Sequence, residues 1–365
     1  KNNNWGDYYL LRNDSSYHLI SEIFFIDSLQ FKNTKKLKNS TLNILFKPLL
    51  QSQGSSQANK IFKDILSSYS FLKSDSQVDF ARFGKNSIAA LIDVKSQFNS
   101  SLGGLLGISK KEEKWILTGK IDLAVENFDK KGTSFLLNWN QPNKSSRFLN
   151  YEFMTPFVMN FPIGVIFSVK QDFLEKEFIL NSFSGAVTTL GPIGKIKFGA
   201  HTDKSNDFIN DKTYKSNSLL LGMLYDSRDN NLLSSFGTFI DMNFSIGFFS
   251  NNNELYNIGS INSVFSKFFS FKSSSLFYHM NWNQVFIDNM DIPNQKKIRF
   301  GGANSLRGYN EKELIADWVI VNTFELSPVI MINKIAPYLF IDHPITNNPS
   351  AKMSYGIGMK NLNNN

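Results

Sequence analysis

Residues able to carry out catalysis are few and scattered in this chain. Its 365 residues include no cysteine, which excludes disulfides, thiolate metal sites and cysteine nucleophiles. The sequence contains neither a Gly-x-Ser-x-Gly turn nor a His-Glu-x-x-His motif. Its four histidines are widely separated: His18, His201, His279 and His343. We therefore expect no enzyme, no metal and no cofactor, with a membrane-embedded protease or phospholipase as the enzymatic alternative.

Polar residues concentrate instead in two short segments. The first, YDSRD, is followed by a Phe-Gly pair, and we expect its charges to form a structural ion pair at the end of a hairpin; it comprises Tyr225, Asp226, Arg228 and Asp229. The second, IRFGGANSLRGY, holds Gly301, Gly302, Arg307, Gly308 and Tyr309. Considered alone, it is a glycine-rich turn with an exposed arginine.

Composition and charge limit the class of protein. Apolar residues make up 42% of the chain, and the net charge is +8. The lysines are spread along the chain without a basic motif that alternates with aromatic residues, so we expect no nucleic-acid partner. No apolar stretch reaches the ~18 residues of a membrane-spanning helix. The chain begins at Lys1 without a signal peptide, and we expect a mature form or a fragment.

Residues 18–97 mix strand and helix patterns. We predict a strand over His18–Asp27, helices over Leu37–Leu50 and Ser56–Ser67, and strands over Ser76–Phe83 and Asn86–Lys95. The order is strand, helix, helix, strand, strand. This pattern indicates a small α+β domain.

From residue 98 onward, segments of roughly ten residues alternate apolar and polar side chains, as strands do. Between Phe236 and Phe249, for example, Phe244, Ile246 and Phe248 share one face and Ser245 and Gly247 share the other. This alternation also fits a soluble β-sandwich. About fourteen such segments without intervening helices, and polar faces rich in Asn, Ser and Gly, favour a transmembrane antiparallel β-barrel.

Four segments together resemble the BamA/TamA-type outer-membrane assembly superfamily, which includes two-partner secretion transporters. They are IRFGGANSLRGY, YDSRD, NTFELSP and YLFID. The resemblance implies a mostly β protein: an N-terminal α+β POTRA domain followed by a barrel, which has sixteen strands in the family. It assigns 1–17 to an N-terminal segment that ends a preceding POTRA, 18–97 to a POTRA domain and 98–365 to the barrel, with an in-folded loop around 290–314.

The same resemblance implies roles for three charged residues. Arg307 lies at the tip of the in-folded loop, and Glu325 and Asp342 match carboxylates that face the lumen from the next two strands. A planar guanidinium can hold a carboxylate through two parallel hydrogen bonds. We therefore expect Arg307 to fix the loop to the barrel wall through both carboxylates, with the ring of Tyr309 packed against the lumen.

The seam between the first and last barrel strands is the family's lateral gate. The first strand is expected within Ser100–Lys110, where Gly103, Gly104 and Gly107 suit a weak, openable seam or a bend in the strand. Beyond Ser354–Lys360 the chain lacks about two of the family's strands, so we expect either a truncation or a partial sequence.

The function implied is the folding and insertion of β-barrel clients into the outer membrane of a diderm bacterium, with the POTRA domain in the periplasm. The expected partners are unfolded outer-membrane proteins, the lipid bilayer, and periplasmic or lipoprotein subunits that add to a POTRA strand such as Val78–Phe83. The alternative is a secretion pore of the two-partner or TamA-like type.

Overall fold

The computed structural model describes residues 8–13, 16–21, 25–32, 35–50, 52–69, 71–83, 87–111, 114–159, 161–191, 194–228, 236–251, 254–272, 274–328 and 335–361. They form two compact units. Unit 1 contains Lys1–Ser100 and two turns, Val125–Ser134 and Thr155–Gly164; unit 2 contains the rest of the chain.

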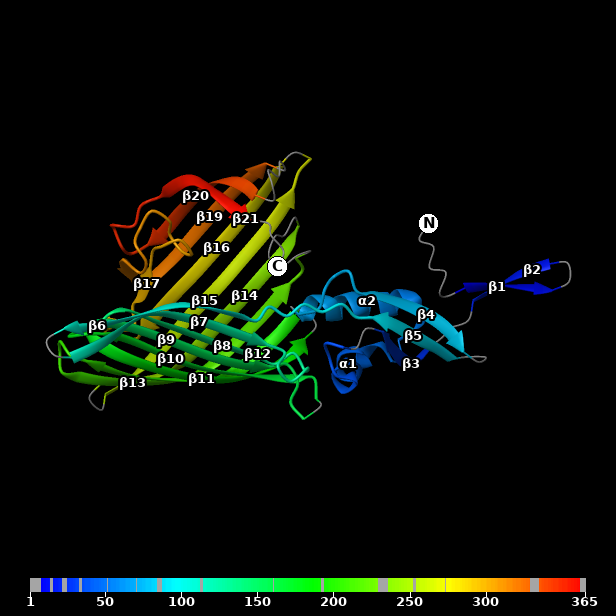
Figure 1. Cartoon of the computed structure of the whole chain (residues 1–365), viewed down its shortest axis with the longest axis horizontal. Helices are drawn as coiled ribbons and strands as arrows, with labels where there is room; N and C mark the ends of the chain where they lie inside the picture. Colours follow the sequence, from blue (N-terminus) through cyan, green and yellow to red (C-terminus); the bar gives the residue numbers. More distant parts are fainter. Residues whose placement is uncertain are drawn as a thin grey trace. The chain divides into compact units, whose positions relative to one another are not determined.

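Unit 1 is an α+β structure with a small sheet of strand order β3-β5-β4 (Figure 1). Its rings of Phe46 and Phe62 lie 5.6 Å apart between the helices, and Phe46 also meets Phe31 of the sheet at 5.9 Å. The predicted order of strand, helix, helix, strand, strand is confirmed, with a hairpin before it. The elements are β1 (Tyr8–Asn13), β2 (Ser16–Ser21), β3 (Phe25–Lys32), α1 (Asn39–Phe46), the 3-10 helix η1 (Lys47–Leu49), α2 (Gly54–Ser68), β4 (Gln77–Phe83) and β5 (Ser87–Asp93).

The single strand predicted over His18–Asp27 is wrong. The structure has β2, which pairs with β1 in the hairpin, and then β3, which runs parallel to β5. One continuous apolar sequence therefore contributes to two strands with different partners. Alternation within the sequence could not reveal the break, because both halves satisfy a strand pattern.

Unit 2 is built on one antiparallel sheet of fourteen strands, the number expected from the sequence. Neighbours in sequence are neighbours in the sheet, except that β16 pairs with β19 across a long loop. The strands are β6 (Ser101–Lys111), β7 (Lys114–Glu126), β8 (Ser134–Asn143), β9 (Ser146–Thr155), β10 (Ile163–Leu174), β11 (Phe178–Gly191), β12 (Gly194–Asp207), β13 (Lys212–Asp226), β14 (Gly237–Asn251), β15 (Glu254–Ser270), β16 (Ser274–Ile287), β19 (Trp318–Pro328), β20 (Ile335–Thr346) and β21 (Ser354–Asn361).

The two faces of this sheet differ in polarity as predicted. On β14, Ile246 and Phe248 are 66% and 61% exposed on the outer face. On the inner face, Asn243 donates to Asp241 at 2.8 Å and the Ser245 hydroxyl meets that of Ser260 at 2.7 Å. An exposed apolar face opposite a hydrogen-bonded polar face is typical of membrane barrels and excludes the soluble-sandwich alternative.

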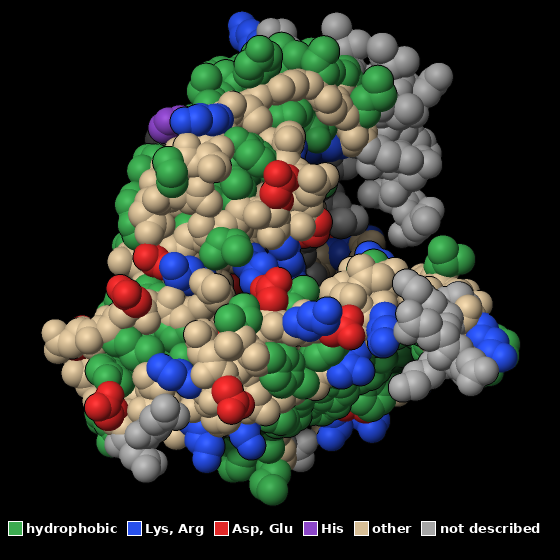
Figure 2. All heavy atoms as spheres, turned by 90° about the vertical axis from the view of Figure 1, so that its left-hand side faces the viewer, with side chains coloured by type: hydrophobic (Ala, Val, Ile, Leu, Met, Phe, Trp, Pro, Cys, Tyr) green, Lys and Arg blue, Asp and Glu red, His purple; other side chains and the backbone are tan. Residues whose placement is uncertain are grey.

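Figure 2, which views the molecule from the left-hand side of Figure 1, shows hydrophobic side chains on the outer surface, with charged side chains both among them and around the hollow. In the part of the chain that is described, β6 and β21 are the edges of the sheet and do not pair with each other. Among the described helices, none has the length and apolarity needed to cross a membrane.

Candidate functional site

The loop between β16 and β19 folds against the inner face of the sheet. Within it, β17 (Ile298–Phe300) pairs with β18 (Leu314–Ala316). These strands and Leu306 form a buried apolar cluster with Val319 and Val321 on the inner face of β19. Apolar packing therefore fixes the base of the loop, and the predicted motif forms its tip.

Three glycines give this tip its sharp turns. The angle φ is +113° at Gly301, +99° at Gly302 and +88° at Gly308, a region that residues with a Cβ rarely adopt. A Cβ on Gly302 would also lie 2.1 Å from the carboxylate of Glu311. The glycines of the motif are therefore required by the backbone path that brings Arg307 to the wall.

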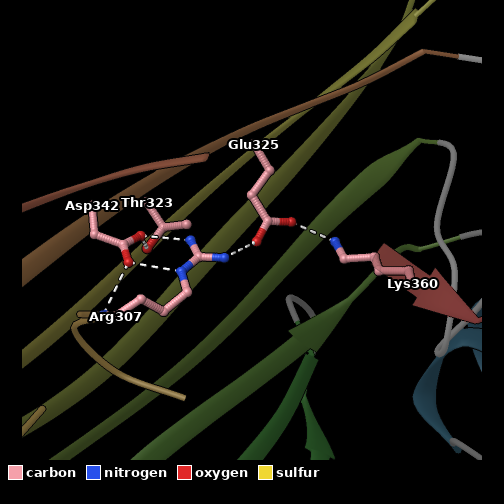
Figure 3. Close-up of polar contacts among 5 residues, drawn as sticks. All are labelled: Arg307, Thr323, Glu325, Asp342 and Lys360. Carbon is pink, nitrogen blue, oxygen red and sulfur yellow. Dashed lines mark hydrogen bonds and ion pairs between the residues drawn. The ribbon is translucent and has the colours of Figure 1, made fainter. Parts of the chain in front are cut away.

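Arg307 meets both of the carboxylates that the family resemblance assigned to it (Figure 3). Its Nε and Nη2 donate to the two oxygens of Asp342 at 2.7 and 2.6 Å, and its Nη1 donates to Glu325 at 2.8 Å. Asp342 is fully buried and also accepts from the Thr323 hydroxyl at 2.8 Å. Because a buried charge needs partners, this cluster is a specific and strong attachment.

Aromatic rings complete the pocket around the guanidinium. Its carbon lies 3.6 Å from the ring centroid of Phe340, in cation–π geometry. Opposite, β21 carries glycines at inner positions: a Cβ at Gly356 would lie 2.8 Å from Phe340, and one at Gly358 would lie 2.2 Å from Tyr338. The alternating glycines of β21 therefore leave room for the rings beside Arg307.

Lys360 of β21 is a member of this cluster that the sequence reasoning missed. Its ammonium group bonds the second oxygen of Glu325 and lies 4.8 Å from the ring centroid of Tyr338. The chain of contacts thus runs Asp342, Arg307, Glu325, Lys360 and joins the loop to three strands. The sequence did contain a signal for Lys360: it is a single lysine on the inner side of a strand whose outer side is apolar.

We expect Lys360→Met to lower the free energy of unfolding by only about 0.5–1 kcal/mol, the usual value of a partly exposed ion pair. The Lys360 side chain is 38% exposed, and Glu325 keeps its bond to Arg307. Thermal unfolding in detergent measures the effect, with Lys352→Met as the matched exposed control. A loss of several kcal/mol would contradict this secondary role.

Tyr309 fastens the other side of the tip. Its hydroxyl donates to the carbonyl of Ser350 at 3.0 Å and accepts from the Lys352 amide at 2.8 Å. Its ring packs beside the apolar cluster at the base of the loop. The motif therefore also holds the turn between β20 and β21.

A second anchor, which the sequence reasoning also missed, lies on different strands. Lys296 bonds Asp203 of β12 and donates to the Ser216 hydroxyl of β13 at 2.9 Å. His201 contacts the other oxygen of Asp203 at 2.8 Å. Lys296 and Asp203 are nearly buried, with side chains 9% and 8% exposed. The loop is therefore attached by cations at two separate places on the sheet.

Two further loop cations make weaker contacts. Arg299 lies 3.5 Å from Glu177, whose side chain is about half exposed, and 5.4 Å from the ring centroid of Phe178. Lys312 lies 4.3 Å from the ring centroid of Phe148 on β9. Together with the two anchors, they spread the loop across the inner face.

The other predicted residues lie apart from the loop. In the hairpin segment, Arg228 donates to both oxygens of Asp226 at 2.8 and 2.6 Å, which is the expected ion pair. Tyr225 precedes Asp226, the last residue of β13, and Asp229 lies outside the described residues. Among the described residues, no group of three or more His, Asp and Glu could hold a metal ion.

The three glycines of the predicted seam lie on β6, an edge of the sheet. A Cβ on Gly104 would lie 2.5 Å from the Lys120 carbonyl of β7, whereas one on Gly103 would meet nothing within 4 Å. A Cβ on Gly107 would lie 3.1 Å from the Thr118 hydroxyl, the end of a side chain. The first barrel strand is therefore where the sequence placed it, and only one of its glycines is needed for close approach.

Comparison with known proteins decides the family. The Omp85 superfamily domain matches residues 127–327, more than half of the chain. The chain belongs to the Omp85 superfamily. The resemblance inferred from the sequence is thereby confirmed, and membership of this superfamily supports an outer-membrane role in protein insertion or secretion.

Solved structures of CdiB share the fold of this Omp85 protein at low sequence identity. CdiB from Escherichia coli aligns with a TM-score of 0.62 at 11% identity, covering 97% of this chain and 74% of that chain. CdiB from Acinetobacter baumannii aligns with a TM-score of 0.60 at 13% identity, covering 98% of this chain and 73% of that chain. BamA from Haemophilus ducreyi lacking POTRA domains 1-3 aligns with a TM-score of 0.49 at 13% identity, covering 93% of this chain and 76% of that chain. A search of curated proteins found no match.

Proposed function

We propose that this Omp85 protein folds and inserts client β-barrel proteins at the free edge of β6. The observation that carries the proposal is the character of this strand. Leu102, Leu105 and Ile108 are each at least 70% exposed, and one side of its backbone has no partner in the described sheet. Unpaired backbone groups in lipid are costly, so such an edge favours pairing with an incoming strand.

The glycines of β6 make this edge adaptable. Glycine weakens a strand because it loses more conformational entropy and contributes no side chain to packing. Exchange of pairing partners at β6 then needs less energy than at a Val- or Ile-rich strand. A locally thinned bilayer beside a weak seam would lower the cost of placing client strands in lipid, without nucleotide or cofactor.

Unit 1 fits the role of a periplasmic POTRA domain. Its sheet has the order β3-β5-β4, in which one side of β4 has no partner strand among the described residues. An extended client or an accessory subunit would add to this edge as a further strand. In this proposal, the domain delivers unfolded chains to the barrel.

A secretion pore is the second candidate, favoured by the space beneath the loop. A cavity of about 380 Å³ lies there, lined by serines and asparagines of the inner face and by loop cations. Movement of the loop would extend this polar space into a passage for a client chain. An insertion factor needs the loop in place, whereas a pore needs it to leave.

Reconstitution of the full chain in liposomes tests the proposal. We expect faster folding of an unrelated, urea-unfolded barrel protein, and slower folding with Gly103→Val than with the wild type. Valine stabilises a strand by up to ~1 kcal/mol, and nothing obstructs a side chain at Gly103. Without acceleration, and with ion conductance that rises when residues 288–317 are deleted, the protein is a secretion pore.

A further inference from the structure

The outer face of unit 2 carries a groove of about 710 Å³ over β11–β14. We name it the outer groove. Its floor is the row of paired residues Gly185, Ala200, Leu219 and Ile246. Phe183 and Phe248 stand beside this row and are 45% and 61% exposed. The hollow exists because a glycine and an alanine lie between larger apolar side chains.

Polarity changes in steps along the strands that line the outer groove. One row beyond the floor, the Thr202 hydroxyl donates to the amide oxygen of Asn217 at 2.7 Å. The next outward-facing pair is Lys204 and Lys215, which are directly opposite each other in the register of β12 and β13. At about 3.3 Å per residue, these lysines lie roughly 13 Å along the strand from Ala200.

The two lysines are unusual neighbours. Directly opposed like charges destabilise a strand pair. Both side chains are exposed, and neither has an acidic partner within the part of the chain that is described. Their other neighbours in this row are Asn181 on β11 and Ser250 on β14, which carry no charge. An anion shared by both ammonium groups would relieve the repulsion.

We propose that the outer groove binds one membrane lipid with an anionic phosphate headgroup. An acyl chain fills the hollow over Gly185 and Ala200, and the phosphate accepts hydrogen bonds from Lys204 and Lys215. The polar pair of Thr202 and Asn217 lies between them, at the level of the ester groups. Along the groove, the apolar floor is followed by the polar pair and then by the two lysines. The acyl chain, ester groups and phosphate of such a lipid follow one another in the same order, whereas a free phosphate or a soluble ligand has no such sequence of groups. The site is independent of whether this Omp85 protein inserts or secretes its clients.

The test uses the purified full chain in detergent, titrated with phosphatidylglycerol or phosphatidylcholine, with bound lipid counted by native mass spectrometry. We expect one phosphatidylglycerol to be retained at concentrations where phosphatidylcholine is not. The double variant K204S/K215S should weaken phosphatidylglycerol binding about thirtyfold, the effect expected of two lysines at an anionic headgroup. The matched control K144S/K176S removes two exposed lysines from turns at the same end of the strands and should change nothing.

A second variant tests the apolar part of the site. A Cβ on Gly185 meets nothing within 4 Å, so Gly185→Leu fills the groove without displacing its neighbours. It should reduce phosphatidylglycerol binding while both lysines remain. Retention that is unchanged in K204S/K215S and in Gly185→Leu would overturn the proposal. Full competition by inorganic phosphate, with no effect of Gly185→Leu, would also overturn it, because the ligand would then be the phosphate alone.

Discussion

Arg307→Ala is expected to abolish client folding and to lower the free energy of unfolding by about 3–5 kcal/mol, the usual effect of removing one partner from a buried charge cluster. The variant leaves the fully buried Asp342 without its cation, and Glu325 keeps only Lys360. Thermal unfolding in detergent and the liposome folding assay measure the two effects. The tip of the loop would then be held by Tyr309, by the hydrogen bond from the backbone N–H of residue 307 to Asp342, and by apolar packing at its base.

Two further variants separate charge from geometry. Arg307→Lys keeps the charge but cannot form the parallel bonds to Asp342, so it should restore part of the stability and little of the activity. Arg299→Ala removes an arginine from the same loop whose carboxylate partner is 3.5 Å away and half exposed, and it should have little effect. A fully active, equally heat-resistant Arg307→Ala variant would exclude the loop attachment from the mechanism.

Much of this architecture was available from local patterns. Alternation along a strand reports which face each side chain takes, and the faces of β14 were predicted correctly from Phe244, Ile246 and Phe248. The partners of Arg307 were implied by the family resemblance, which matched Glu325 and Asp342 to carboxylates on the two strands after the loop. Alternation agrees with this assignment because it assigns both carboxylates to the inner face, but it does not select them as the partners of Arg307.

The missed residues show where such reasoning ends. Lys296 and Asp203 are 93 positions apart, and they meet only because the loop crosses the inner face of the sheet. Period-two alternation assigns Asp203 to the inner face, but it contains no information on which loop residue lies above it. The same limit hid the outer groove, since its floor depends on the register that brings Gly185 opposite Ala200. Which loop residue lies above a strand, and which residues face each other on neighbouring strands, depend on the whole sheet and not on any one strand.

Release of the loop is expected to require the loss of both anchors. Lys296 and Arg307 attach to different strands, β12 with β13 and β19 with β20, so either attachment alone can keep the loop against the inner face. We therefore expect low ion conductance in planar bilayers for Lys296→Met and for Arg307→Ala. The double variant should conduct severalfold more than the sum of the two, because the two attachments are coupled through the one loop that they hold, and coupled sites give non-additive effects.

The neighbouring lysine provides the matched control. Lys297 lies 3.6 Å from Asp317, and both side chains are about one-third exposed, so Lys297→Met combined with Arg307→Ala should conduct no more than Arg307→Ala alone. Recording from the heat-resistant folded fraction removes unfolded chains from the comparison. High conductance in Arg307→Ala alone would mean that Lys296 does not hold the loop. Low conductance in the double variant would mean that apolar packing of Leu306 against Val319 and Val321 is sufficient to keep the interior closed.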